Sequence, residues 1–216
     1  NGVDLAAIRP LAEPSRYRAE WGIDPGATVA LYAGNLGRKQ GLEVLAGAAR
    51  RLAAEPGVRI VVVGDGPGGE EIAPAAVHLP NLRLMPLQPR ERLGDLLGLA
   101  DIHLLPQRAD AADLVMPSKL PGMLASGRPV VAGARPGTAL AAAVEGAGTA
   151  VPPDDPAAWA AAVAVLAGDP AARARLGAAA RRRAEAEWDQ GAILARFEAE
   201  LMVLAADSVA GGRPID

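Results

Sequence analysis

The sequence predicts an α/β fold built on a doubly wound, six-stranded parallel sheet, with additional helices at the C-terminal end. Three observations predict this class. Short apolar segments alternate with longer alanine-rich segments of helical periodicity. The short segments are apolar almost without interruption, which is typical of parallel strands covered by helices on both faces. After residue 151 the strands end, and only helical segments follow.

Six short segments are expected to form the strands. The first, residues 28–33, reads TVALYA and lies between Pro25-Gly26 and Gly34. Because proline and glycine interrupt regular structure, these flanks define one buried strand. The other five are residues 59–63, 82–85, 102–105, 129–134 and 149–151. Right-handed crossovers between successive parallel strands then give a Rossmann-like sheet.

Helices are expected between and after these strands. Residues 42–54 carry leucine and alanine at helical spacing, and a short helix follows the glycines after residue 64. Residues 91–100, 117–126 and 137–144 are the remaining helices between strands. Three successive helices then cover residues 155–167, 170–187 and 189–206. Asp169 and Asp189 stand where the last two helices would begin, as N-caps.

The chain divides into four parts on this basis. Residues 1–20 begin with Asn1-Gly2-Val3-Asp4 rather than Met and contain several prolines, so we expect the remnant of an interdomain linker from a longer chain. Residues 21–168 form the Rossmann-like domain. Residues 169–206 form C-terminal helices that pack on it, and residues 207–216 form a frayed tail.

Composition excludes several classes of function. The chain has 216 residues, of which 50% are hydrophobic and 22% charged, and its net charge is −3. A nucleic-acid-binding domain would be strongly basic, so no nucleic-acid partner is expected. The absence of cysteine excludes disulfides, cysteine-ligated metals and a cysteine nucleophile. No apolar run approaches the roughly 18 residues of a membrane span, and no signal peptide begins the chain, so we expect a cytoplasmic protein.

A first candidate anion site follows the first strand. The segment Gly34-Asn35-Leu36-Gly37-Arg38-Lys39-Gln40-Gly41 precedes a predicted helix. Glycines let the backbone approach a ligand, and a helix N-terminus carries a partial positive charge. Arg38 and Lys39 add two full charges, which favours phosphate. A tight turn with solvated charges remains the alternative.

The glycines after the second strand resemble a dinucleotide-binding motif only formally. Residues 64–69 match G-x-G-x-x-G, but they follow the second strand rather than the first. Asp65 would place a carboxylate beside a pyrophosphate, and Pro67 removes an N–H donor. No acidic residue follows the third strand to bind a ribose. We therefore expect a turn that lines a ligand rather than a nicotinamide site.

A second candidate anion site precedes the helix predicted for residues 117–126. Pro117 suits a first helical turn, and Ser118 and Lys119 would add a hydroxyl, an ammonium and free N–H groups. A plain helix cap is the alternative. Lys39 and Lys119 are the two lysines of the chain, one in each candidate site. Two cationic helix entrances that face one crevice would bind a diphosphate without a metal.

Four motifs, in this order, carry a resemblance to a known family. They are residues 34–41 (GNLGRKQG), 62–66 (VVGDG), 100–103 (ADIH) and 123–131 (MLASGRPVV). The chain resembles the C-terminal, donor-binding half of family 4 retaining glycosyltransferases, which have the two-domain GT-B fold. The Lys-Gln-Gly spacing and Met116-Pro117-Ser118-Lys119-Leu120 are most similar to the colanic-acid and exopolysaccharide branch.

The resemblance implies roles for individual residues. Arg38 and Lys39 would hold the nucleotide diphosphate and stabilise the leaving group. The implied donor-binding residues are Gly34, Asn35, Gly37, Gly64, Gly66, Met85, Leu87, Pro117, Ser118 and Lys119. The family carries two glutamates around this helix, where this chain has Leu114 and Gly122. Asp113 could replace the first, and nothing nearby replaces the second.

The implied activity is that of a bacterial hexosyltransferase. It moves a hexose from a GDP- or UDP-linked donor to a lipid-linked or polysaccharide acceptor, and it needs no metal or cofactor. Its implied partner is a missing N-terminal acceptor domain, so the chain alone would be inactive. Membrane contact would occur only through that half or the acceptor lipid. A non-catalytic nucleotide-binding domain and a sugar-nucleotide epimerase of the same fold remain alternatives.

Several other conspicuous residues have structural interpretations. His103 lies within an apolar strand and is expected to be a satisfied core or edge histidine. Arg181-Arg182-Arg183 lies on a helix rich in alanine and glutamate, so a solvated face is expected, with contact to a membrane surface or a partner domain as the alternative. Trp159, Trp188 and Phe197 are interpreted as packing anchors for the terminal helices.

Overall fold

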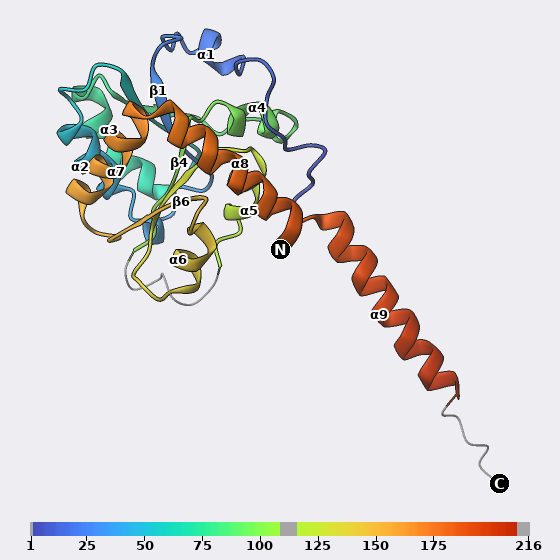
Figure 1. Cartoon of the computed structure of the whole chain (residues 1–216). Helices are drawn as coiled ribbons and strands as arrows, with labels where there is room; N and C mark the ends of the chain where they lie inside the picture. Colours follow the sequence, from blue (N-terminus) through green and yellow to red (C-terminus); the bar gives the residue numbers. More distant parts are fainter. Residues whose placement is uncertain (1, 109–115, 211–216) are drawn as a thin grey trace.

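The predicted fold class is confirmed. A computed structural model of the chain describes residues 2–108 and 116–210. Six strands form one parallel sheet in the order β3-β2-β1-β4-β5-β6 (Figure 1). They are β1 (Thr28–Ala33), β2 (Val58–Val63), β3 (Leu82–Met85), β4 (Ile102–Leu105), β5 (Val130–Gly133) and β6 (Gly148–Val151). Each matches a predicted strand to within one residue at either end.

Nine α-helices and two 3-10 turns lie in the described part of the chain. The helices are α1 (Tyr17–Glu20), α2 (Glu43–Arg51), α3 (Pro67–His78), α4 (Leu93–Gly98), α5 (Leu120–Ala125), α6 (Ala139–Val144), α7 (Pro156–Gly168), α8 (Pro170–Glu187) and α9 (Gln190–Ala210). The 3-10 turns are η1 (Arg38–Gln40) and η2 (Arg90–Arg92). Asp169 and Asp189 accept backbone N–H groups two or three residues ahead, at 2.8 and 2.9 Å, as the predicted N-caps should.

The sheet is covered on both faces, and the sequence of β1 reflects this. Helices α2, α3 and α7 cover one face, while α4, α5, α6 and α8 cover the other. Successive residues of a strand point to opposite faces. Val29 and Leu31 therefore belong to one core cluster, and Ala30 and Tyr32 to the other. All six residues of β1 are buried, which explains why the run is apolar throughout.

The strand order places a crevice at the carboxyl end of β1. The chain leaves β1 for β2 and β3 on one side, then returns to β4 on the other side. The loops after β1 and β4 therefore diverge. Ligands of open parallel sheets bind at such a switch point, outside the carboxyl ends of the strands. Gly34 and the segment before α5 lie on either side of it.

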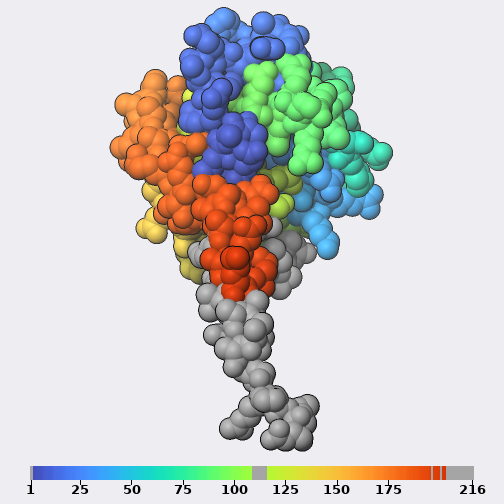
Figure 2. Space-filling model, turned by 90° about the vertical axis from the view of Figure 1, so that its right-hand side faces the viewer, coloured from blue at the N-terminus to red at the C-terminus, as the bar shows by residue number. Residues whose placement is uncertain are grey.

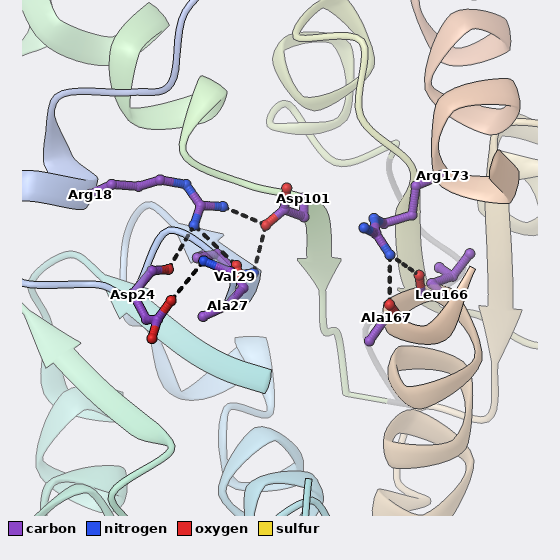
Figure 3. Close-up of polar contacts among 9 residues, drawn as sticks. Arg18, Asp24, Ala27, Val29, Asp101, Leu166, Ala167 and Arg173 are labelled. Carbon is purple, nitrogen blue, oxygen red and sulfur yellow. Dashed lines mark hydrogen bonds and ion pairs between the residues drawn. The ribbon is translucent and has the colours of Figure 1, made fainter. Parts of the chain in front are cut away.

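Polar contacts fasten the opposite, amino end of the sheet (Figure 3). The Arg18 guanidinium donates to Asp101 Oδ2 at 2.6 Å and to the Ala27 carbonyl at 3.0 Å. The same Asp101 oxygen accepts the Val29 N–H at 2.8 Å. The segment before β1 is thus tied to the residue before β4.

A second polar contact joins two of the helices. Arg173 of α8 donates to the Ala167 carbonyl at the end of α7, at 2.8 Å.

The N-terminal segment packs against the start of α9. Val3 N–H donates to the Trp188 carbonyl at 2.8 Å, and Gln190 N–H donates to the Val3 carbonyl at 3.1 Å. Residues within the expected linker, 1–20, include the short helix α1. Helix α9 ends at Ala210, four residues beyond its predicted end.

The arginine cluster of α8 corrects the expectation of a solvated face. Arg181 donates to the carbonyls of Ile8 at 2.8 Å and Ala125 at 2.9 Å, and so joins the N-terminal segment to α5. Arg183 donates to the Ala143 carbonyl at the end of α6, at 2.7 Å. Only Arg182 of the three is exposed. The sequence does not reveal these contacts, because the acceptors are backbone carbonyls, which every residue carries.

Helix α9 extends away from the rest of the molecule (Figures 1 and 2). Phe197 is 57% exposed and does not anchor α9 to the described part of the domain, so its interpretation as a packing anchor is wrong. Trp159 is fully buried and Trp188 packs against the core, as expected. Leu194, Leu201 and Met202 are also exposed on α9. Within the described ranges, no helix is both long and apolar enough to cross a bilayer.

The helix predicted from Pro117 begins instead at Leu120. The proline in its first turn is Pro121, not Pro117. Because proline lacks an N–H, it is tolerated in a first turn but not in the second. A helix from Pro117 would place Pro121 beyond its first turn. Residues 117–120 form a turn instead, in which Leu120 N–H donates to the Pro117 carbonyl at 3.1 Å.

His103 is a buried neutral histidine. Its Nε2 lies 2.9 Å from Ser126 Oγ, and that hydroxyl donates to the Met123 carbonyl at 2.6 Å. Since the hydroxyl proton is used there, Nε2 carries the imidazole proton and donates it to Ser126. Burial, helped by the Arg128 charge, lowers the pKa of His103 to about 3.

This histidine makes stability depend on pH. In the unfolded chain it binds a proton near pH 6.5, whereas the folded chain resists protonation down to about pH 3. Its contribution is therefore complete above pH 6.5 and is lost as the pH falls toward 3. In this window the free energy of unfolding of the unaltered chain should fall by roughly 1.4 kcal/mol per pH unit. We expect His103→Leu to abolish this part of the pH dependence. Urea unfolding at several pH values measures it. Leucine at the exposed His78 is the control, and equal slopes for both variants would contradict the account.

Candidate functional site

The loops after β1 and β2 are joined at the carboxyl edge of the sheet. Gly34 N–H donates to the Val63 carbonyl at 2.9 Å, and Leu36 N–H donates to the Asp65 carbonyl at 2.9 Å. In return, Gly68 N–H at the start of α3 donates to the Leu36 carbonyl at 2.6 Å. The predicted glycine turns therefore form one connected backbone surface.

Two positions of this surface require glycine. Gly34 and Gly64 have φ of +143° and +154°, values that side chains disfavour. A Cβ on Gly64 would overlap the Gly34 carbonyl oxygen. A Cβ on Gly34 would overlap Cε of Lys119. The missing side chain at Gly34 is thus the space through which Lys119 passes.

Lys119 ends above the ring of Tyr32. Its Nζ lies 5.3 Å from the centroid of that ring. Burial lowers the pKa of the Lys119 ammonium. No carboxylate of the described residues pairs with this charge. The site therefore holds a cation that is partly removed from water and available to an anionic ligand.

A cavity of about 680 Å³ adjoins Lys119. Its walls come from the end of β1, the start of α5, η2 with α4, and the N-terminal segment. The residues that line it include Gly34, Glu91, Ser118, Lys119 and Gly122. A cavity of this size can hold a ligand as large as a nucleotide.

Arg38 and Lys39 lie outside the walls of this cavity. They form the 3-10 turn η1, and Gly41, in the left-handed conformation, separates them from α2. Both side chains are exposed, and Arg38 Nε lies 3.4 Å from Glu71 Oε1. The two lysines therefore do not stand at two equivalent helix entrances: η1 precedes one helix, and a turn precedes the other. Lys119 is the N-cap residue of α5, whereas Lys39 lies in η1 and is separated from the start of α2 by Gln40, Gly41 and Leu42.

The remaining predicted residues lie around the same edge. The Asn35 carbonyl accepts the Tyr32 hydroxyl at 2.6 Å, and Gly66 and Gly37 lie beside Asn35. Met85 is half-buried at the end of β3, and Leu87 is 65% exposed. Ser118 is exposed on the cavity wall, next to the half-buried Pro117. Asp113 and Leu114 lie outside the described residues. Gly122 lines the cavity without supplying a carboxylate.

Two residues of the site were missed by sequence analysis. Tyr32 lies within an apolar strand, where an aromatic residue indicates packing only. Glu91 follows β3 by six residues, and its position after a strand end was the available signal. In the ranges 2–108 and 116–210, no cluster of three or more histidine or acidic residues could hold a metal ion. The chemistry offered by the described site is anion binding by the Lys119 ammonium.

A family model described as "Glycosyl transferases group 1" matches residues 27–169. WcaI of Escherichia coli strain K12, a putative colanic acid biosynthesis glycosyl transferase, is 39% identical over 118 residues. That alignment covers 54% of this chain and 29% of WcaI. A D-inositol 3-phosphate glycosyltransferase of Segniliparus rotundus is 32% identical over 211 residues, which cover 93% of this chain and 46% of the relative.

The fold is similar to that of Anabaena Alr3699/HepE in complex with UDP. The TM-score is 0.79 at 21% identity, and the match covers 94% of this chain and 56% of that chain. The alignments with both curated relatives cover less than half of the relatives' length.

The close approach of Lys119 to Gly34 generates a prediction. We expect Gly34→Ala to displace Lys119 and weaken the binding of inorganic pyrophosphate at least about tenfold, since the Lys119 ammonium would leave the site. Gly168→Ala is the matched control because a Cβ there meets nothing within 4 Å. Calorimetry measures both. Unchanged pyrophosphate affinity in a folded Gly34→Ala variant would contradict the geometry.

Proposed function

The chain belongs to the glycosyl transferases group 1 family, with the fold of the C-terminal half of a GT-B glycosyltransferase, and we propose that it binds a nucleotide-sugar donor. The observation that carries this proposal is the half-buried ammonium of Lys119, which lies over Gly34 at the wall of the cavity. An ammonium that no carboxylate of residues 2–108 and 116–210 neutralises, beside backbone that only glycine permits, suits a diphosphate.

The proposed chemistry is electrostatic. When the bond between the sugar's anomeric carbon and the phosphate oxygen breaks, the electron pair remains on the leaving diphosphate. Cations that are already in place stabilise this charge without reorganisation. Lys119 supplies one such charge from the cavity wall. Arg38 and Lys39, on the adjoining η1 turn, would supply two more, with Arg38 leaving its contact with Glu71.

We propose UDP or GDP as the nucleotide and a hexose as the sugar, transferred with retention of configuration. The UDP bound to HepE supports a uridine nucleotide only by analogy of fold. Met85 and Leu87, at the carboxyl end of β3, are the proposed backbone contacts of the base. Neither a metal nor another cofactor enters this proposal.

The proposed acceptor is a lipid-linked or polysaccharide hydroxyl. The relative that acts in colanic acid biosynthesis supports an exopolysaccharide product, whereas the relative named for D-inositol 3-phosphate supports a smaller acceptor. We favour the first because WcaI has the higher identity. A lipid-linked acceptor would place the reaction in the cytoplasm, at the inner face of the membrane.

The proposed partner is an acceptor-binding half of the same protein. The curated relatives are more than twice as long as the regions they share with this chain. Leu194, Phe197 and Leu201 recur at helical spacing on α9 and are each about half exposed, so this face offers an apolar surface to such a partner. We expect the chain alone to bind the nucleotide without transferring the sugar.

Two alternatives are separated by assay. Position 122, where the family carries a glutamate, is a glycine in this cavity wall, which favours a non-catalytic nucleotide-binding domain. Such a domain would bind UDP and UDP-sugars equally well. A sugar-nucleotide epimerase would convert its donor in the absence of any acceptor, and chromatography of the sugar nucleotide detects that reaction.

Substitution of the basic residues tests the assignment. A thermal-shift panel of UDP, GDP, ADP and their sugars first identifies the nucleotide. We then expect Lys119→Ala, Lys39→Ala and Arg38→Ala each to weaken its binding at least about tenfold, because each removes a charge-assisted contact. Arg182→Ala, on the exposed side of α8, should bind as the unaltered chain does. Equal affinities for all four variants in calorimetry would refute the site.

The lowered pKa of Lys119 makes nucleotide binding depend on pH. The phosphate oxygens of UDP are fully ionised above about pH 8. The uracil N–H also loses its proton in alkaline solution, but this change is the same for every variant of the protein. As the pH rises through the lowered pKa, Lys119 loses its proton and the anion loses a partner. We expect UDP affinity to fall as the pH rises above 8. Arginine keeps its proton in alkaline solution, so the fall should be smaller in the Lys119→Arg variant. A fall of equal size in both proteins would assign the titration to another group.

A further inference from the structure

We infer that Tyr32 is a positioning residue that holds Lys119 over the glycine loop and fixes that loop at the same time. This inference rests on the proposed function, since it assigns how the donor's diphosphate meets a fixed charge. Tyr32 makes no contact with the donor itself in this account. It acts through its ring face on Lys119 and through its hydroxyl on Asn35.

The path of the lysine side chain supports this role. Lys119 precedes Leu120, which belongs to the core cluster on the α5 side of the sheet. Tyr32 belongs to the cluster on the opposite, α2 side. The lysine therefore crosses the edge of β1, over Gly34, and its ammonium ends 5.3 Å from the centre of the tyrosine ring. Only a residue without a side chain at position 34 permits this crossing.

The ring explains why the ammonium stays at that position. The face of an aromatic ring carries negative potential and attracts a cation within about 6 Å. No carboxylate in the described residues competes for Lys119. A carboxylate there would hold the ammonium more strongly, but it would repel a diphosphate. An aromatic face orients the charge and leaves it unneutralised for the ligand.

The hydroxyl of the same residue fixes the loop after β1. It donates to the Asn35 carbonyl at 2.6 Å. Burial raises the pKa of the Tyr32 phenol, so the group remains protonated and keeps donating. Asn35 lies between Gly34 and Gly37, at the start of the loop that carries Arg38 and Lys39. The buried Tyr32 side chain thus fixes both the position of Lys119 at the cavity and the start of the loop that carries Arg38 and Lys39.

A double-mutant cycle tests whether Tyr32 acts through Lys119. With tyrosine at position 32, we expect Lys119→Met to weaken UDP binding at least about tenfold. In a Tyr32→Leu background the same change should cost less than about threefold, because the ammonium is no longer held in place. Tyr32→Phe keeps the ring, so the effect of Lys119→Met should stay near its original size.

Tyr17 provides the matched control. It is also fully buried and also lies under a cation, with Arg92 4.0 Å from its ring centroid, but it belongs to α1. In a Tyr17→Leu background, the cost of Lys119→Met should remain complete. If the costs in the Tyr32→Leu and Tyr17→Leu backgrounds are equal, Tyr32 is core packing only and the inference fails.

A spectroscopic test needs neither ligand nor activity. The chain has two lysines, so reductive ¹³C-methylation gives two lysine signals besides that of the N-terminal amine. We expect the Lys119 methyl protons to be shifted upfield by the tyrosine ring, with Lys39→Arg used for assignment. The shift should persist in Tyr32→Phe and disappear in Tyr32→Leu. Absence of any upfield lysine signal in the unaltered chain overturns the inference even if Tyr32→Leu does not fold.

The two tests separate this inference from the proposed function. An upfield lysine signal without binding of any nucleotide would keep the Tyr32–Lys119 contact and refute the proposed function. Nucleotide binding that depends on Lys119, with additive effects of Tyr32→Leu, would keep the function and refute the inference.

Discussion

The passage of one lysine side chain over one glycine determines the candidate site. Lys119 can reach the ring of Tyr32 only because Gly34 has no Cβ, and Gly34 can hold its backbone conformation only because it is glycine. The consequence is an ammonium that has lost part of its water without gaining a carboxylate from the part of the chain that the structure describes. Such a charge is costly for the folded protein and useful to an anionic ligand.

The sheet makes this approach possible. Strand order brings β1 and β4 side by side while their connections run to opposite sides, which leaves a crevice that the Lys119 side chain crosses to reach Gly34. The backbone bonds between the β1 and β2 loops keep the glycine surface rigid. At the other end, Arg18 and Asp101 tie the segments before the same two strands together. The site is thus built where the chain reverses, on strands held at both ends.

Sequence analysis predicted the strands because burial on both faces demands unbroken apolar runs, and the six runs are short and separated by glycine and proline. It misjudged the start of α5 because two prolines, Pro117 and Pro121, compete for the first helical turn, and only the second is compatible with the helix that follows. It expected the arginines of α8 to be solvated, since partners that are backbone carbonyls leave no trace in composition. Tyr32 was missed for a different reason. An aromatic ring in a buried strand indicates packing, and its contact with Lys119 depends on tertiary structure. The contact of Arg38 with Glu71 is equally invisible to local pattern.

A crystal structure of this chain with UDP tests the central claim most directly. The account predicts the diphosphate at the carboxyl edge of β1, with a phosphate oxygen within hydrogen-bonding distance of the Lys119 ammonium and the nucleoside in the adjoining cavity. A diphosphate bound away from Lys119, with that ammonium still facing solvent or the tyrosine ring alone, would contradict it.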